Sequence, residues 1–76
     1  MTPYRNVNGG SNVEAFEIDA DSITVRFRSG RWRNYLYTSR RPGPAVVERM
    51  KALALQGHGL NSYISTTVRS SFESKW

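Results

Sequence analysis

Ser22-Ile-Thr-Val-Arg-Phe-Arg-Ser-Gly-Arg-Trp-Arg-Asn-Tyr-Leu-Tyr37 is the stretch on which the fold of this 76-residue chain depends. Ile23, Val25 and Phe27 alternate with polar residues, which is the period of two of a half-buried strand. A second strand follows the turn formers Ser29-Gly30. The stretch therefore predicts an antiparallel β-hairpin, and it carries four of the eleven Lys and Arg residues of the chain.

The length of the turn decides which face of the hairpin carries the tyrosines. A two-residue turn at Ser29-Gly30 pairs Phe27 with Trp32. In this register the core set is Ile23, Val25, Phe27, Trp32 and Leu36, and the opposite set is Arg26, Arg28, Arg31, Arg33, Tyr35 and Tyr37. We expect this register, because burying an unpaired arginine costs far more than burying an indole.

A three-residue turn with Gly30 in a left-handed bulge is the alternative. It shifts the pairing by one residue and moves every side chain of the second strand to the other face. Arg33, Tyr35 and Tyr37 would then lie over the core with their polar ends at its rim. The sequence leaves both registers open, and they differ in whether arginines and tyrosines share an exposed face.

One strand precedes the hairpin. Val13 to Asp19 is expected to form it, with Phe16 and Ile18 on one face, and the segment from Asp19 to Ser22 supplies side chains that cap a turn. Residues 1–11 are expected to be a flexible N-terminal arm, because Asn8-Gly9-Gly10-Ser11 has the composition of a hinge. Residues 12–76 then form a single domain.

Two helices follow the hairpin. Ala45 to Gln56 predicts the main helix, and Gly57 ends it. Its apolar stripe at helical spacing is Val46, Met50, Leu53 and Ala54. Asn61 can cap a shorter helix, whose end is uncertain because Ser65-Thr-Thr67 lowers helix propensity. The sequence predicts an α+β fold: a three-stranded antiparallel β-meander with the main helix and a shorter C-terminal helix packed on one face.

Composition points to the compartment. The chain has no cysteine, which is typical of a reducing environment. Its N-terminus lacks the apolar stretch of a signal peptide. The longest apolar run, Ala52 to Leu55, is too short to cross a bilayer. We expect a cytoplasmic protein that does not bind a membrane.

The chain is strongly basic, with a formal net charge of +5 and a pI of about 10.3. Only Lys51 and Lys75 are lysines, and the other cations are arginines. The planar guanidinium group binds phosphate with two donors and stacks on bases. An arginine-rich, aromatic-containing domain is typical of nucleic-acid binding, although small proteins also carry such charge for solubility.

The exposed face of the hairpin and the loop after it form the candidate site. The candidate nucleic-acid-binding residues are Arg26, Arg28, Arg31, Arg33, Tyr35, Tyr37, Arg40 and Arg41. The arginines would contact phosphates, while the tyrosines would stack on unpaired bases.

Few residues suggest catalysis. His58, the only histidine, lies between Gly57 and Gly59 with no nucleophile beside it in sequence. The acidic segment from Glu17 to Asp21 lacks the ligand number and the glycine-shaped loop of a hard-cation site. We predict no catalytic residue, cofactor or metal. Binding of a small nucleotide between the hairpin and the His58 loop is a minor alternative.

Three segments resemble a known family. Tyr35-Leu-Tyr37, the helix from Val47 to Ala54, and the segment from Gly57 to Ile64 follow one another as in the KTSC domain. That small domain is named for its place at the C-terminus of some lysyl-tRNA synthetases and also occurs as a stand-alone protein. The resemblance covers residues 13–72, with Tyr35 and Tyr37 matching the family's tyrosine-x-tyrosine. It implies RNA binding, which has been suggested from the attachment to a synthetase.

Two functions are therefore expected. The first is a non-catalytic module that binds RNA or another polyanion through the basic and aromatic hairpin face. The alternative is a protein-protein interaction or accessory module of a bacterial or phage protein. Small stand-alone size and the lack of a catalytic set of residues motivate this alternative, and the sequence does not predict the oligomeric state.

Overall fold

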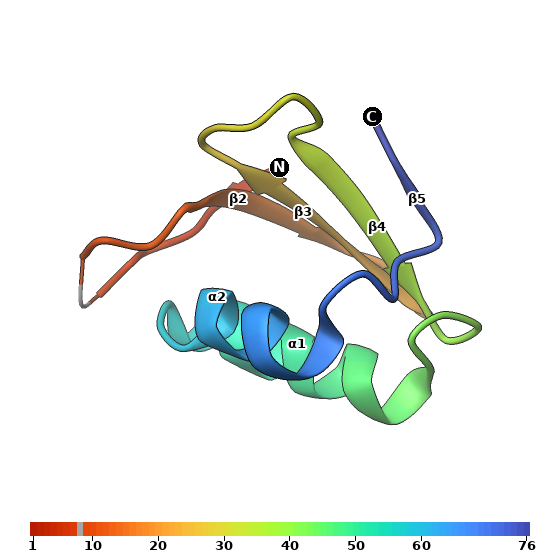
Figure 1. The fold of residues 1–76 in the computed structure, drawn as a ribbon. Helices are drawn as coiled ribbons and strands as arrows, with labels where there is room; N and C mark the ends of the chain where they lie inside the picture. Colours follow the sequence, from red (N-terminus) through yellow and green to blue (C-terminus); the bar gives the residue numbers. More distant parts are fainter. Residues whose placement is uncertain (8) are drawn as a thin grey trace.

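A five-stranded antiparallel sheet with all its described helices on one face makes up the computed structural model (Figure 1). The structure describes residues 1–7 and 9–76. The strands are β1 (Thr2–Pro3), β2 (Val13–Ile18), β3 (Ser22–Phe27), β4 (Asn34–Thr38) and β5 (Ser74–Lys75). They lie in the sheet in chain order. The α+β class and the central meander are confirmed, while the two short edge strands β1 and β5 were not predicted.

The helices are α1 (Pro44–Gln56), α2 (Leu60–Tyr63) and the π-helix η1 (Ile64–Val68). Pro44 suits the first turn of α1, where its missing N–H group is not needed. Gly57 ends α1 in the left-handed conformation with φ 81°. In the described part of the chain, no helix has the length and apolar character needed to span a membrane.

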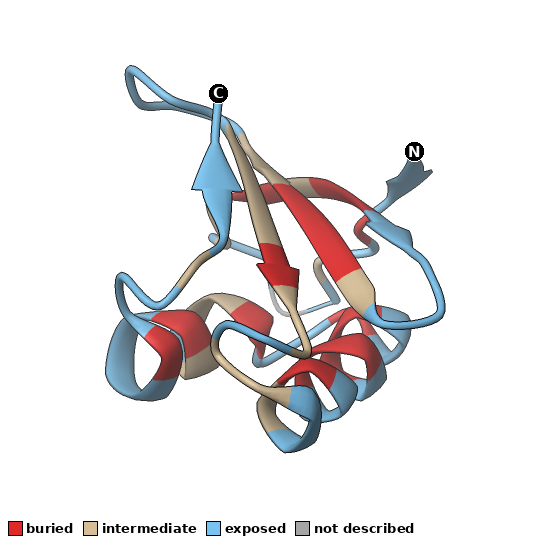
Figure 2. Ribbon diagram, turned by 90° about the vertical axis from the view of Figure 1, so that its right-hand side faces the viewer, coloured by how far each residue is buried: buried red, intermediate tan, exposed pale blue. Residues whose placement is uncertain are grey.

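The core lies between the sheet and the helices. Figure 2 shows the buried positions gathered in the strands and helices, with the C-terminal strand exposed. The core residues are Tyr4, Val13, Phe16, Ile23, Val25, Tyr37, Val47, Met50, Leu53, Ala54, Leu60, Ile64 and Val68. The predicted stripe of α1 is largely confirmed, but Val47 is more deeply buried than Val46. Lys51 is only 9% exposed, and its ammonium group donates to the carbonyl of Ala20 at 2.9 Å.

The pairing of β3 with β4 takes the alternative register. Ile23 lies opposite Tyr37, and Val25 lies opposite Tyr35. The expected two-residue turn was therefore wrong. The physical reason is that residues 28–33 form a longer loop, with Gly30 at φ 118°. This loop removes Trp32 and its flanking arginines from the strand, so the sheet buries tyrosine rings without burying a charge.

The N-terminal residues pack against the rest of the domain. Thr2 in β1 pairs with Phe16 in β2. Tyr4 is only 5% exposed, and its hydroxyl accepts the N–H of Leu60 at 3.3 Å. A segment expected to be a flexible arm thus contributes an edge strand and a core side chain.

Arg5 ties the same segment to α1. Its guanidinium group donates to the carbonyls of Leu55 and Gln56 at 2.6 and 2.9 Å, where the helix has unpaired acceptors. The boundary expected after residue 11 therefore marks no change in packing. Asn8, part of the expected hinge, lies outside the described residues.

Candidate nucleic-acid interface

The two hairpin tyrosines face the helices. Tyr37 is 1% exposed, and its burial raises the pKa of its hydroxyl well above the ordinary value, with a smaller contribution from Tyr35. Tyr35 is half-buried at the edge of the core. The register thus separates the tyrosines from Arg26, which lies on the opposite face of β3. An exposed face that carries both tyrosines together with the arginines is not formed.

A groove opens beside Tyr35, at the end of the sheet that carries the β3–β4 loop. Its volume is about 590 Å³. One wall is aromatic: the ring of Tyr35 meets those of Phe27 and Phe72 edge to face, with centroids 5.3 and 5.0 Å apart. We call this hollow the aromatic groove. It is lined by Asn12, Phe27, Ser29, Gly30, Arg31, Trp32, Tyr35, Tyr37, Ile64, Arg69, Ser70, Phe72 and Lys75.

The charge of the aromatic groove is entirely positive. Its described lining includes Arg31, Arg69 and Lys75 and no acidic residue. The guanidinium carbon of Arg31 lies 5.6 Å from the ring centroid of Trp32, and the ammonium of Lys75 lies 5.4 Å from that of Phe72. Exposed contacts of this kind contribute about 0.5–1 kcal/mol. Such weak contacts leave the cations able to turn toward an anion.

Two predicted arginines are engaged within the protein. Arg26 donates to the side-chain oxygen of Asn34 at 3.1 Å. Arg33 pairs with Glu14 at 3.0 Å and also donates to the carbonyl of Phe27. Both partners of the ion pair are about half exposed, so its contribution to stability is small. These contacts direct both guanidinium groups away from the aromatic groove.

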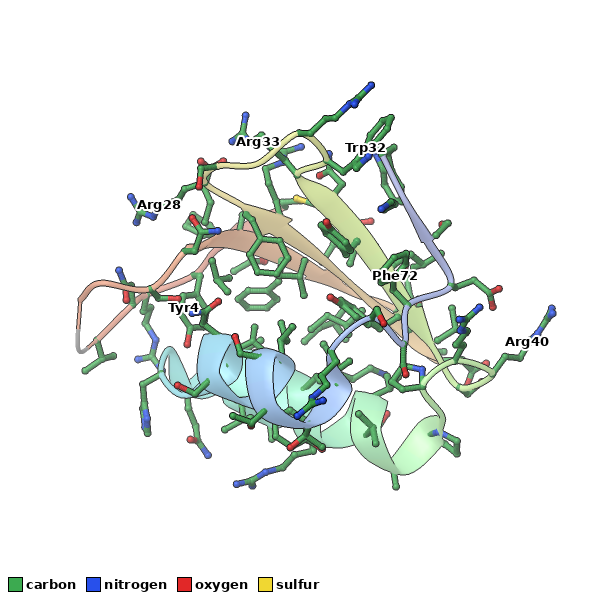
Figure 3. The ribbon with its side chains drawn as sticks, viewed as in Figure 1. Tyr4, Arg28, Trp32, Arg33, Arg40 and Phe72 are labelled. Atoms are coloured by element: carbon green, nitrogen blue, oxygen red, sulfur yellow. The ribbon has the colours of Figure 1, made fainter. Side chains whose placement is uncertain are left out.

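The other predicted arginines lie at opposite ends of the sheet. Figure 3 shows Arg28 near the β3–β4 loop and Arg40 at the far end, beyond β4. Arg40 lies 3.8 Å from Glu73, and Arg41 follows it in the same exposed turn. Of the eight predicted residues, the aromatic groove brings together only Arg31, Tyr35 and Tyr37.

Sequence reasoning missed several groove residues. Trp32 was assigned to the core but is 43% exposed, and Phe27 is half-buried at the groove wall. Phe72 has the helical spacing of the predicted second helix but lies outside any helix, and Lys75 lies in a tail for which no element was predicted. The pairing of β5 with β4 places Lys75 opposite Tyr35. A two-residue strand is too short for a sequence pattern to reveal it.

Arg69 has an unusual backbone. It follows the π-helix η1 with φ 52° and ψ −124°, a region that residues with a β-carbon seldom adopt. Such a conformation costs about 1–3 kcal/mol and is often found at functional sites, as are π-helical turns. Both features adjoin the aromatic groove.

His58 lines a different hollow. This smaller space of about 170 Å³ lies between the N-terminal residues and the α1–α2 turn, with Tyr4, Asn6 and Asn61 among its walls. The hairpin and the His58 loop therefore do not line one common pocket in the described structure. Within residues 1–7 and 9–76, no cluster of three or more potential metal ligands is found.

Comparison with known proteins adds no parallel for this arrangement. No family model, curated protein or solved structure matches the chain. The resemblance to the KTSC domain stays a prediction, and the function has to be argued from the geometry of the aromatic groove.

Proposed function

We propose that the chain is a small non-catalytic module that binds single-stranded nucleic acid, with RNA as the first candidate. The observation that carries this proposal is the aromatic groove, in which half-buried rings and three cations meet without an acidic residue. Aromatic rings stack on unpaired bases of any sequence, and cations contact the phosphates. The resemblance to the KTSC domain is the reason to place RNA before DNA.

Trp32 takes the role that the sequence assigned to the tyrosines. Trp32, labelled in Figure 3, is 43% exposed. It lies beside Arg31, and both residues line the aromatic groove. An exposed ring with a guanidinium group next to it offers a base one stacking face and its phosphate one donor. Tyr35 and Phe72 continue the aromatic surface inward.

The cations around the aromatic groove set the expected salt dependence. Arg28 is exposed in the β3–β4 loop, and Arg31, Arg69 and Lys75 line the groove, which gives four phosphate contacts. Four contacts to a single strand predict a slope of about −3 for log affinity against log salt. Affinity should then fall about fiftyfold between about 50 and 200 mM salt.

A binding titration tests the proposal. Short fluorescently labelled RNA, single-stranded DNA and duplex RNA of equal length are titrated with the protein at several salt concentrations. We expect the single strands to bind more tightly than the duplex, because pairing hides the base faces. Arg31→Gln should reduce the salt slope by about 0.7, whereas Arg49→Gln on α1 should leave it unchanged. Affinity that is independent of salt, or no binding at low salt, would contradict the proposal.

The uncovered face of the sheet supports a second candidate, a protein-interaction module. The described helices all cover one face (Figure 1), and the other face carries the half-buried Arg26 and Leu36 without a helix over it. A partner could pack against this face. Substituting Leu36→Asp and measuring retention of lysate proteins, together with the oligomeric state, separates the two candidates. Under the first proposal, this substitution leaves nucleic-acid affinity unchanged.

A further inference from the structure

We infer that the aromatic groove takes one whole nucleotide of the bound strand, with its base among the rings and its phosphate at the cationic rim. The inference rests on the function proposed above, because it names the part of the strand that the groove takes. It goes further in predicting that a free nucleoside monophosphate binds the same groove.

The dimensions of the aromatic groove suit this ligand. A volume of about 590 Å³ lies within the usual range for small-molecule sites. The rings of Phe27, Tyr35 and Phe72 form a continuous apolar wall, because each neighbouring pair lies within 5.3 Å between centroids. A flat base can pack against such a wall by stacking or by edge contacts.

Polar groups lie where a base edge needs them. Asn12, Ser29 and Ser70 line the aromatic groove together with the rings. The hydroxyl of Ser29 donates to the side-chain oxygen of Asn12 at 3.1 Å. This bond leaves the amide NH₂ of Asn12 able to donate to a base.

The charge of the groove selects an anion over a neutral aromatic ligand. Arg31, Arg69 and Lys75 come from the β3–β4 loop, from the segment after η1, and from β5. Three cations from separate segments around one groove offer a phosphate group several donors. The described lining holds no carboxylate that would repel it.

Arg69 is the rim residue with the strongest structural argument. Its positive φ places an arginine where a glycine would be accommodated at lower cost. The chain thus has a strained backbone at a position whose side chain lines the groove. A role for the guanidinium group in binding accounts for the presence of arginine there.

The two tryptophans of the chain allow the groove to be observed separately. Trp32 lines the aromatic groove, whereas Trp76 does not, so a Trp76→Phe variant reports on the groove through its only indole. This variant is titrated with adenosine 5′-monophosphate, adenosine and inorganic phosphate. We expect the monophosphate to change Trp32 fluorescence at a lower concentration than either part alone. A Trp32→Phe variant, which retains Trp76, should show a smaller change.

Further variants test whether the monophosphate and the RNA strand bind in the same groove. Phe72→Leu and Arg69→Gln should each weaken monophosphate binding about fivefold or more, and labelled RNA binding in parallel. Arg49→Gln is the matched control on α1 and should change neither. Circular dichroism and the unfolding midpoint show that each variant is folded.

The outcomes separate the inference from the proposed function. If RNA binds with the expected salt dependence while the monophosphate leaves Trp32 unchanged and Phe72→Leu binds RNA normally, the inference is overturned and the function stands. A response to inorganic phosphate as strong as that to the monophosphate also overturns it, because the groove is then an anion site without base recognition. If the monophosphate binds and RNA does not, the proposed binding of single-stranded nucleic acid is overturned, and the aromatic groove is a site for free nucleotides.

Discussion

Ile23 and Tyr37 lie directly opposite each other in the pairing of β3 with β4. Both side chains are almost fully buried under the helices, so this pair fixes the register of the central hairpin. A shift of one residue would bring Leu36 to the core face in place of the two tyrosines. The tyrosines therefore contribute mainly to the core and to the wall of the aromatic groove.

The burial of Tyr37 predicts a loss of stability at alkaline pH. Its pKa is raised in the folded state, so the folded protein holds this proton more tightly than the unfolded chain does. The stabilisation is complete below the unfolded pKa of about 10 and is lost as the pH rises above it, by up to about 1.4 kcal/mol per pH unit. Urea unfolding of the wild type and of Tyr37→Phe between about pH 8 and 11 measures this.

The control for this experiment is Tyr63→Phe. Tyr63 is half-buried at the edge of the core. In Tyr63→Phe, the free energy of unfolding should fall with rising alkaline pH as steeply as in the wild type. Tyr37→Phe should make this fall less steep. An equally steep loss of stability in Tyr37→Phe would show that other groups cause it.

The contact between Tyr4 and Leu60 predicts that the N-terminal segment stabilises the whole domain. In Tyr4→Phe the N–H of Leu60 loses its acceptor in a fully buried environment. An unsatisfied buried donor costs about 1–3 kcal/mol, which chemical unfolding should detect. A variant as stable as the wild type would show that water or another carbonyl replaces the phenol oxygen.

Sequence reasoning recovered the elements that follow a clear period. The alternation of Ile23, Val25 and Phe27 and the helical spacing of Met50 and Leu53 are local signals, and both predicted elements formed. The register depended on the length of the turn, which local patterns do not determine. The expected register came from comparing the cost of burying Trp32 with the cost of burying the arginines. A longer loop, which buries neither, was not considered.

The candidate site was harder to predict because distant segments build it. Arg31 and Tyr35 were identified from the hairpin alone. Arg69 lines the aromatic groove from the end of η1, and Phe72 and Lys75 line it because the tail returns along β4 and adds an edge strand. Tertiary pairing of a two-residue strand leaves almost no trace in sequence.

The close approach of Gly57 to Arg5 allows a test of packing at the end of α1. Both Gly57 and Gly59 have positive φ, so alanine at either position should cost about 1–2 kcal/mol. A β-carbon on Gly57 would also come within 2.8 Å of the β-carbon of Arg5, whereas one on Gly59 makes only an ordinary contact. Thermal or urea unfolding should therefore show Gly57→Ala to be the less stable variant by at least about 1 kcal/mol. Equal losses would mean that Arg5 moves away freely.

Arg69→Gly should separate stability from binding. Glycine adopts the backbone conformation of residue 69 without strain, so the free energy of unfolding should rise by about 1 kcal/mol. RNA affinity should fall, because a cation leaves the rim of the aromatic groove. Arg49→Gly within α1 is the matched control: it should lose about 1 kcal/mol of stability and retain RNA affinity. A destabilised Arg69→Gly would show that its side chain is held by structural contacts.

Trp32→Ala and Trp76→Ala remove the same ring from two exposed positions. Only Trp32 lines the aromatic groove, while Trp76 is 53% exposed at the end of β5 and pairs with Asn34 through its backbone alone. Loss of a stacked base costs about 1–3 kcal/mol, so Trp32→Ala should weaken RNA binding by about 5-fold to 150-fold. Trp76→Ala should change it less than twofold, because its backbone bonds remain. Anisotropy titrations at one fixed salt concentration measure both. Equal losses of RNA affinity in the two variants would contradict stacking in the aromatic groove and would indicate that bases stack at the outer end of the sheet.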